Sequence, residues 1–338
     1  MTHKTIIIAE AGVNHNGSRD LAIQLVRAAA AAGADFVKFQ TFKADRLVAA
    51  NAPKAQYQKE NCPDGDNSQL AMLRRLELNQ FDFEAIASEC KKQGIGFMST
   101  PFDEESVDML AQLGMSYWKI PSGEITNLPL LRKIASTGGK IILSTGMSTP
   151  GEINDALNVL STAGTPRSDI PLLHCTTQYP APLSSVNLLA IDALRQMGCG
   201  GVGYSDHTEG LLIPIAAAAL GADVIEKHFT LDRALPGPDH KASLTPDELA
   251  QMVQEIRKVE MALGDGVKKV TDAERPNISV ARKSIVASRH IKKGEILSPE
   301  NLTCKRPANG LSPLLWDSVC GTKAVADFLP DQPIHLGI

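Results

Sequence analysis

One pattern is repeated eight times before residue 264, and this repetition limits the possible folds more than any other feature of the sequence. Each repeat has a short apolar run, then a polar cluster containing Gly, Ser, Thr or Asn, and then an amphipathic stretch of helical periodicity. Alternating strands and helices predict parallel pairing, and eight units predict an α/β fold of the (β/α)₈ or TIM-barrel class that ends near Gly264. An open doubly wound sheet is the alternative. The predicted strands are TIIIAEAG, DFVKFQTF, GIGFMSTPF, YWKIPSGE, KIILSTGM, IPLLHCTTQYP, GGVGYSDHT and DVIEKHFTL.

The alternation of predicted strands and helices stops after the eighth repeat. Residues 265–279 are mostly polar and predict a linker between domains. Residues 280–338 contain short strand-like runs and turns without a long amphipathic helix, which predicts a small, mainly β module. We therefore expect a barrel domain over 1–264, a linker over 265–279 and a second domain over 280–338. A module of about 60 residues has a marginal core, so we expect it to dock on a partner surface.

Charge and cysteine content exclude several classes of protein. A net charge of −4 and a pI near 6.1 argue against nucleic-acid binding, so a site for an anion must be local. Six cysteines without a C-x-x-C pair indicate reduced thiols in a cytoplasmic protein. The longest apolar run, residues 211–222, is too short to cross a bilayer, so we expect no membrane partner.

Each predicted strand ends in polar side chains, where catalytic groups lie in barrels of this class. A single polar residue in an apolar run is most simply a hydrogen-bonded core side chain, but eight such strand ends together indicate a site. In strand order these residues are Glu10, Asn14 and His15; Lys38 and Gln40; Ser99 and Thr100; Lys119, Ser122 and Glu124; Ser144 and Thr145; Tyr179; Ser205, Asp206 and His207; Lys227 and His228.

Two histidines end adjacent predicted strands. His207 and His228 would lie within range of one divalent ion, with Asp, Glu or water completing the coordination. The alternative is a structural role for both rings. His15 and His174 are competing ligands, and the position of His174 in the middle of a strand favours a core role.

A second group of strand ends predicts a site for a small anion. Lys38 and Lys119 would neutralise a carboxylate or phosphate, while the hydroxyls of Ser122 and Ser144 and the backbone at Gly146 would supply directional hydrogen bonds. The alternative is that the lysines only pair with carboxylates at the barrel mouth, such as Glu10 or Glu124. The absence of a Walker loop and of a G-x-G-x-x-G motif after a strand disfavours nucleotide chemistry.

Nine ordered motifs give the chain a specific family resemblance. IIIAEAGVNHNGS, VKFQTFKAD, STPFDEESVD, WKIPSGE, ILSTGM, GYSDHT, EKHFTLD, GPDH and KRPANG closely resemble the sialic acid synthases, which make N-acetylneuraminate and related nonulosonic acids. The resemblance extends through the C-terminal module, which is similar to the antifreeze-like (SAF) domain of these enzymes. It implies condensation of phosphoenolpyruvate with an open-chain N-acylated amino-sugar aldehyde, with Mn²⁺ or Mg²⁺ as cofactor and release of phosphate.

The resemblance also implies a role for particular residues. His207 and His228 would be metal ligands, and Glu124 would transfer a proton. Glu10 would be a second catalytic carboxylate at the sugar. The residues around phosphoenolpyruvate would be Lys38, Thr100, Lys119, Ser122, Ser144 and Ser205, and those at the amino sugar would be Gln40, Tyr179, Asp239 and Arg306. Thr177 departs from relatives that have Asn at this position, which puts one phosphate contact in doubt.

The resemblance further implies a domain-swapped homodimer in which Arg306 reaches the barrel of the other subunit. Its sugar is not fixed by the motifs: N-acetylmannosamine, giving N-acetylneuraminate, is placed first, and 2,4-diacetamido-2,4,6-trideoxymannose, giving N,N′-diacetyllegionaminate, is the alternative. A synthase for arabinose 5-phosphate or erythrose 4-phosphate would need a second phosphate site, which is not evident. An ice-binding protein would need a flat array of Thr, whereas VARKSIVASRHIKKGEIL carries many cations.

Overall fold

The computed structural model describes residues 4–62 and 66–337. The chain divides into two compact units between Gly264 and Asp265. In the described residues no helix is long and apolar enough to cross a membrane. The six cysteines are all free thiols.

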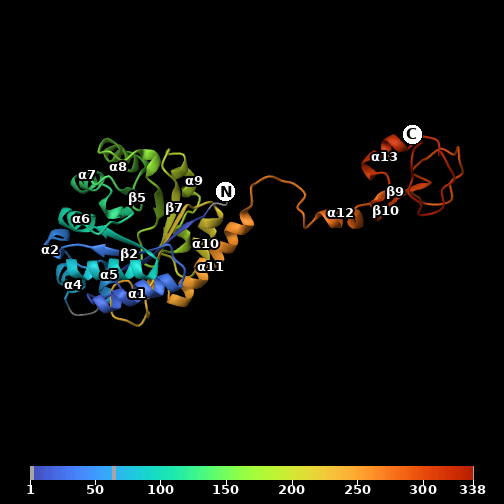
Figure 1. Cartoon of the computed structure of the whole chain (residues 1–338). Coiled ribbons are helices and arrows are strands. Elements are labelled where there is room, and N and C mark those ends of the chain that lie inside the picture. The colour runs from blue at the N-terminus through green and yellow to red at the C-terminus, as the bar shows by residue number, and fades with distance from the viewer. Residues whose placement is uncertain (1–3, 63–65, 338) are drawn as a thin grey trace. The chain divides into compact units, whose positions relative to one another are not determined.

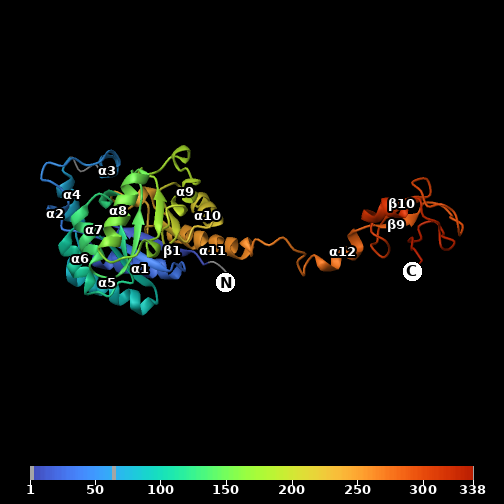
Figure 2. The ribbon, with the colours of Figure 1, turned by 90° about the horizontal axis from the view of Figure 1, so that it is seen from above.

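The first unit is a barrel-like sheet of eight parallel strands surrounded by helices (Figure 1, Figure 2). The strand order β3-β2-β1-β8-β7-β6-β5-β4 follows the chain around the sheet, and its two end strands, β3 and β4, contact each other. This order confirms the predicted barrel and rules out the doubly wound alternative. The strands are β1 Ile6–Gly12, β2 Phe36–Thr41, β3 Gly96–Pro101, β4 Tyr117–Ile120, β5 Lys140–Ser144, β6 Leu172–Cys175, β7 Val202–Asp206 and β8 Val224–His228.

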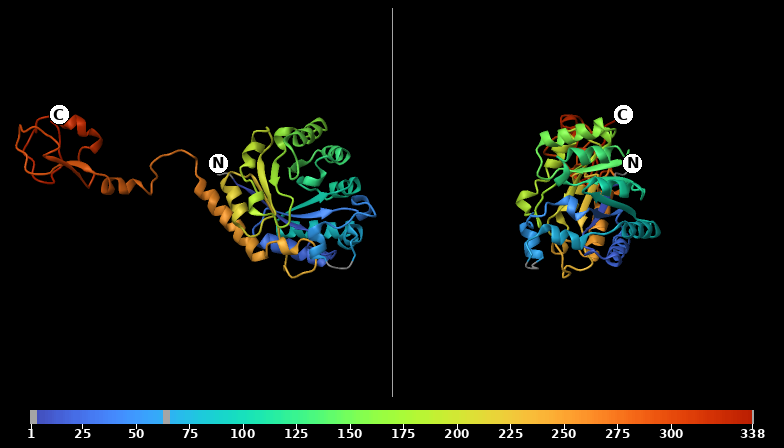
Figure 3. Two further views of the ribbon diagram at one scale, coloured as in Figure 1. Left: turned by 180° about the vertical axis from the view of Figure 1, so that it is seen from behind. Right: turned by 90° about the vertical axis from the view of Figure 1, so that its left-hand side faces the viewer.

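The helices lie outside the strands, as Figure 3 also shows. Several begin with capping residues: Thr149 and Glu152 form a capping box at α8, as Thr245 and Glu248 do at α11, and each of these helices has Pro in its first turn. The helices of this unit are α1 Arg19–Ala31, α2 Ala44–Leu47, α3 Gln56–Asn61, α4 Gln69–Leu76, α5 Gln80–Gln93, α6 Glu104–Ala111, α7 Leu128–Ala135, α8 Pro150–Thr162, α9 Ala190–Arg195, α10 Leu212–Ala219 and α11 Pro246–Leu263.

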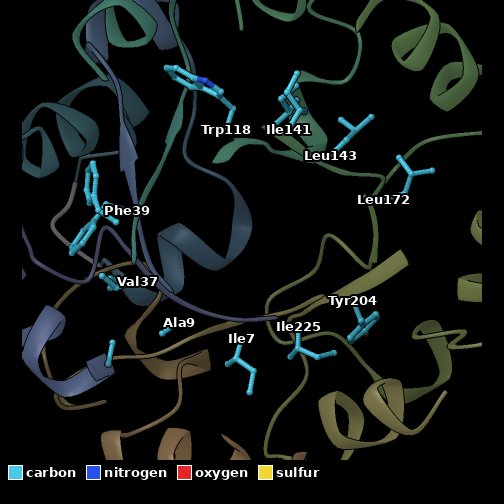
Figure 4. Packing of buried hydrophobic residues seen from close by; sticks show 14 of the residues in the cluster. Ile7, Ala9, Val37, Phe39, Trp118, Ile141, Leu143, Leu172, Tyr204 and Ile225 are labelled. Atoms are coloured by element: carbon cyan, nitrogen blue, oxygen red, sulfur yellow. The ribbon is translucent and has the colours of Figure 1, made fainter. Parts of the chain in front are cut away.

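Strand side chains alternate between two environments, because successive residues of a strand point to opposite faces. One set faces the helices and forms the main core, which includes Ile7, Val37, Ile141, Leu172 and Ile225 (Figure 4). The other set faces the barrel interior, where a separate apolar layer fills the space. That layer consists of Ile8, Met98, Ile142, Leu173 and Val224, all buried.

The second unit contains a short antiparallel sheet of β9 Ser284–Ala287 and β10 Leu302–Lys305. Isolated bridges such as Ile291 to Phe328 extend it, and both of these residues belong to its small apolar core. Its helices are α12 Arg275–Ala281 and α13 Trp316–Val319. Helix α12 begins inside the segment predicted as a linker, with Pro276 in its first turn, where the missing N–H of proline costs no helical hydrogen bond.

Gly203 of β7 tests the packing of the barrel interior. A methyl group at this position would lie 2.3 Å from the carbonyl oxygen of Val224 and 2.5 Å from Leu173 Cδ2, so the strands would have to separate. We expect Gly203→Ala to lower the free energy of unfolding by about 1–3 kcal/mol. The control is Gly151→Ala in α8, where the nearest atom would be 3.9 Å away. Urea unfolding followed by circular dichroism measures both; a Gly203→Ala protein as stable as the control would contradict this packing.

Candidate active site

A polar layer lies directly above the apolar layer of the barrel interior. Two residues beyond Ile8 and Val224 on their strands are Glu10 and Glu226, and the same step leads from Leu173 to Cys175. A step of two residues returns to the same face of a strand, so these side chains also point into the barrel. The complete layer at this level is Glu10, Lys38, Thr100, Lys119, Ser144, Cys175, Ser205 and Glu226.

The layer lines a cavity of about 220 Å³ at the carboxyl ends of the strands. Gln40 of β2, His228 of β8, the loops after the strands and helix α3 supply the rest of its wall. The full lining is Glu10, Lys38, Gln40, Tyr57, Thr100, Phe102, Lys119, Pro121, Ser122, Gly123, Ser144, Cys175, Thr177, Tyr179, Ser205, His207, Glu226 and His228.

A larger cavity, of about 390 Å³, lies elsewhere on the barrel and includes Asn61, Met72, Leu76 and Pro238 in its lining. It contains none of the strand-end lysines, carboxylates or histidines. The smaller cavity is therefore the candidate active site, because it combines convergent charges with perturbed titratable groups.

The floor of the site is a buried cluster of two lysines and two carboxylates. Lys38 Nζ lies 2.8 Å from Glu10 Oε2 and 3.7 Å from Glu226 Oε2, and Lys119 Nζ lies 3.4 Å from Glu226 Oε1. The hydroxyl of Ser205 donates to Glu226 at 2.9 Å. Both lysines are therefore paired with carboxylates. The sequence alternative of pairing with Glu10 or Glu124 holds for Glu10, but the second carboxylate is Glu226 and not Glu124.

Burial and the two lysines set the protonation of this cluster. Burial opposes ionisation of Glu226, but the charges of Lys119 and Lys38 and the hydrogen bond from Ser205 outweigh it and lower its pKa to about 2. Burial raises the pKa of Glu10, opposed by Lys38. Burial also lowers the pKa of Lys119, opposed by Glu226. The charge of Lys119 therefore depends on its carboxylate partner.

The two strand-end histidines lie next to each other at the edge of the cavity. Their ring centroids are 5.6 Å apart. His207 Nδ1 lies 2.7 Å from the carbonyl oxygen of Thr176, while His228 Nδ1 is buried without a hydrogen-bond partner. Burial lowers the pKa of both rings, so both are neutral at pH 7 and have nitrogen lone pairs for a metal.

Within the described residues, the histidine pair can hold a divalent ion only if further ligands join the two rings. Across residues 4–62 and 66–337 no group of three or more His, Cys, Asp or Glu side chains is placed to hold a metal. Two neutral imidazoles, one with its orientation fixed by a backbone carbonyl, match the nitrogen donors that Mn²⁺ accepts. Water and substrate would complete the coordination.

Aromatic rings form one wall beside the histidines. The Tyr179 ring lies 4.1 Å from the His207 ring, and Tyr57 of α3 stacks on Tyr179 at 5.1 Å, measured between centroids. Asp239 is buried nearby. Burial is the main cause of the raised pKa of both tyrosines, and the charge of Asp239 raises it further. Burial, together with the charge of Glu10, raises the pKa of Asp239 to about 7.

The structure gathers most of the predicted site residues in this cavity. Those that line it are Glu10, Lys38, Gln40, Thr100, Lys119, Ser122, Ser144, Tyr179, Ser205, His207 and His228. Three others are placed differently. The carboxylate of Glu124 accepts a hydrogen bond from Asn127 Nδ2 at 2.6 Å. Asp239 is buried near Tyr57 and Tyr179 but does not line the cavity. Arg306 belongs to the second unit, where its Nε donates to the carbonyl of Ala281.

Gly146 occupies a position that excludes any side chain. An added Cβ would lie 2.5 Å from Thr177 Oγ1, 2.8 Å from Cys175 Sγ and 2.9 Å from Ser122 Oγ. Its backbone N–H donates to Ser122 Oγ at 2.9 Å, which fixes that hydroxyl at the cavity wall. The sequence predicted that the backbone at Gly146 would bond an anion, but in the structure its N–H bonds Ser122 and Gly146 does not line the cavity.

Other polar strand-end residues have structural roles. Lys227 and Asp206 form an ion pair with fully buried side chains, on the face opposite to their neighbours Glu226 and Ser205. His174 is half-buried, and its Nε2 lies 2.7 Å from the carbonyl oxygen of Val186. His15 Nδ1 accepts from the Gly17 N–H, and neither His15 nor His174 lines the cavity.

Sequence reasoning missed Glu226, Cys175 and Tyr57. Strand alternation contained the signal for the first two, because Glu226 is two residues before His228 and Cys175 is two residues after Leu173. The position of Tyr57 depends on how α3 folds over the barrel mouth, and no local pattern carries that information.

The chain matches models of two known protein families. A model of the NeuB family matches residues 25–268, and a model of the SAF domain matches residues 282–336. The chain is 54% identical over 98% of its length to N,N′-diacetyllegionaminic acid synthase of Campylobacter jejuni, covering 99% of that protein. It is 48% identical over 94% of its length to the synthase of the same name from Legionella pneumophila, covering 89% of it.

A solved structure shows the same fold. The crystal structure of N-acetylneuraminic acid synthetase from Leptospira borgpetersenii, in complex with citrate, superposes with a TM-score of 0.72. It is 35% identical, and the match covers 81% of this chain and 90% of that one. The chain belongs to the NeuB family and ends in a SAF domain. The resemblance seen in the nine motifs is therefore confirmed, and with it the assignment to a family of synthases.

The raised pKa of Asp239 predicts a pH-dependent stability. A carboxyl group whose pKa rises from 3.8 to about 7 on folding costs stability as pH increases through that window. Asp239→Asn removes this cost, so its gain in unfolding free energy over wild type should be about 2–3 kcal/mol larger at pH 8 than at pH 5.

Urea unfolding of both proteins at the two pH values measures this difference. The control is Glu152→Gln, because the pKa of this exposed carboxyl is lowered by its hydrogen bonds to Thr149 and it stays ionised at both pH values. A gain for Asp239→Asn that is equal at pH 5 and pH 8 would contradict the raised pKa.

Proposed function

We propose that this protein is an N,N′-diacetyllegionaminate synthase, which condenses phosphoenolpyruvate with 2,4-diacetamido-2,4,6-trideoxymannose. The observation that carries the choice of sugar is the identity of 54% and 48% to two synthases of that name, over nearly the whole chain. The structure named for N-acetylneuraminic acid is 35% identical. N-acetylneuraminate, which the motifs alone placed first, is not confirmed, and the comparisons favour the alternative.

In this proposal the polar layer binds phosphoenolpyruvate. Lys38 and Lys119 present two ammonium groups on the cavity floor, and hydroxyl groups surround them. A small ligand with a carboxylate and a phosphate suits two cations and several directional donors. The contributing hydroxyls are those of Thr100, Ser122, Ser144 and Ser205. Ser144 Oγ is buried without a hydrogen-bond partner, so its hydroxyl can donate a hydrogen bond to the ligand.

The sugar would occupy the outer part of the site. Gln40 lies two residues beyond Lys38 on β2, lines the cavity and donates to Glu10 of the polar layer at 3.2 Å. Tyr179 and Tyr57 supply an apolar wall, which suits the acetamido methyl groups and the C6 methyl of a trideoxy sugar. Asp239, buried beside the tyrosines, would bind the polar groups of the sugar.

The reaction forms one carbon–carbon bond and breaks one carbon–oxygen bond. C3 of phosphoenolpyruvate attacks the aldehyde carbon, and the aldehyde oxygen takes up a proton to become a hydroxyl. Water adds to the cationic C2 and loses a proton, and phosphate leaves with the bridging oxygen as the 2-keto acid forms. Glu124 is the proposed proton-transfer group, and Glu10 holds the sugar against the reacting carbon.

His207 and His228 would hold Mn²⁺ or Mg²⁺, which supplies Lewis-acid chemistry at the aldehyde when bound. The role of the protein is to orient these rings. Thr176 fixes His207 through its carbonyl, and Tyr179 covers the same ring. Closure by aromatic rings also excludes water from the aldehyde.

The sugar preference tests the proposed function. We expect kcat/KM for 2,4-diacetamido-2,4,6-trideoxymannose to exceed that for N-acetylmannosamine by roughly tenfold to two-hundredfold, because a site shaped for an acetamido group and a methyl group leaves its contacts unmade with the hydroxylated sugar. Phosphate release with each sugar measures this ratio. A larger kcat/KM with N-acetylmannosamine would replace the proposal by the N-acetylneuraminate alternative.

The metal assignment has its own test. His207→Ala and His228→Ala each remove a proposed ligand, so we expect Mn²⁺ affinity to fall by roughly a hundredfold or more. Equilibrium dialysis followed by metal analysis measures this without an activity assay. His174→Ala is the matched control, since this ring bonds a backbone carbonyl outside the cavity. Wild-type affinity in the His207→Ala and His228→Ala proteins would contradict the assignment.

The role of Arg306 is the last part of the proposal. Arg306 is exposed on the SAF domain, and in a domain-swapped homodimer it would reach the sugar site of the partner. Chains with Arg306→Ala and chains with His207→Ala, each inactive alone, should regain activity when they are dissociated and mixed, because one site of each heterodimer combines an intact barrel with an intact arginine. No recovery in dimers shown to be mixed would reject action in trans.

A further inference from the structure

Glu226 is a buried carboxylate on the floor of the site, and the proposed chemistry leaves it without a role. It lies on β8 with its side chain on the floor of the cavity, 5% exposed. Its Oε1 lies 3.4 Å from Lys119 Nζ and accepts from Ser205 at 2.9 Å. Its Oε2 lies 3.7 Å from Lys38 Nζ and has no hydrogen-bond partner. The negatively charged carboxylate of Glu226 therefore lies in the cavity that is proposed to bind an anionic substrate.

The two lysines depend on Glu226 to different degrees. Lys38 has a second carboxylate, Glu10, at 2.8 Å. For Lys119, the described part of the chain provides one carboxylate within ion-pair distance, that of Glu226. The other titratable groups that face Lys119 are Lys38, Cys175 and the more distant Glu10. A buried ammonium group without a counter-charge loses its proton readily, because burial penalises the charged form.

We propose that Glu226 is a positioning residue that serves as the internal counter-anion of the empty site. It holds the Lys119 ammonium group charged and directed at the cavity until an anionic substrate supplies replacement negative charge. The substrate class is a small dianion or trianion with carboxylate or phosphate groups; its identification as phosphoenolpyruvate rests on the proposed function.

The geometry distinguishes this role from simple repulsion of the substrate. If Glu226 only repelled anions, its removal would strengthen anion binding and leave the protonation of the site unchanged. If it maintains the charge of Lys119, its removal leaves that amine neutral in the empty site, and an anion must bring a proton with it when it binds. The two roles therefore differ in the number of protons taken up on binding.

The test is calorimetric titration of the full chain with phosphoenolpyruvate near pH 8, in two buffers of different ionisation enthalpy. At this pH the ligand is fully ionised, so proton uptake reports on the protein. We expect uptake close to zero for wild type and approaching one proton for Glu226→Gln. Affinity of the Glu226→Gln protein should fall by up to roughly tenfold per pH unit as pH rises further. Glu226→Asp retains the charge, so its proton uptake should stay closer to that of wild type than to that of Glu226→Gln.

Each other outcome overturns the inference. Binding by Glu226→Gln with the proton uptake and pH dependence of wild type would show that Lys119 does not need this carboxylate. Tighter binding without proton uptake would assign Glu226 the repulsive role. If Glu226→Gln does not fold, the wild-type titration still decides, because uptake of about one proton by wild type would mean that Lys119 is neutral beside Glu226. Failure of wild type to bind either phosphoenolpyruvate or inorganic phosphate would reject the proposed function and this inference together.

Discussion

The buried pairing of Lys38 and Lys119 with Glu10 and Glu226 is the interaction on which the rest of the site depends. Four charged side chains from four strands meet directly above an apolar layer, where burial weakens the screening of their charges by water. A lone ammonium group at this depth would be neutral, and a lone carboxylate would be protonated. Because the charges balance, the barrel can bury two cations and keep them available to an anion.

The arrangement of strands explains why these residues meet. Parallel strands in sequential order bring all eight carboxyl ends to one edge, and a register that pairs Glu10 with both Lys38 and His228 places a carboxylate, an ammonium group and an imidazole in adjacent positions. Apolar residues two positions earlier fill the interior below. The same alternation that forms the core therefore also delivers the polar layer, one level higher.

The fold and most of the site follow from local sequence patterns. The barrel could be predicted because strand and helix periodicities alternate, and Lys38, Lys119 and His207 could be predicted because polar residues at strand ends gather at one edge. Two other features of the site were not predicted. The carboxylate partner of Lys119 depends on which face of its strand each side chain occupies. Glu226 lies two residues before His228, so strand alternation places both side chains on the same face. The stacking of Tyr57 on Tyr179 depends on the path of a helix over the barrel mouth, which is a tertiary property. Under the proposed function, such peripheral contacts would select the sugar, and the motifs shared by the family do not specify them.

A crystal structure of the full chain with phosphoenolpyruvate bound tests the central claim most directly. The account expects the ligand in the cavity of the polar layer, with its anionic groups within hydrogen-bond distance of Lys38 Nζ and Lys119 Nζ and with hydroxyls such as Ser144 as further donors. Phosphoenolpyruvate bound outside this cavity, with both lysines still paired only to Glu10 and Glu226, would contradict it.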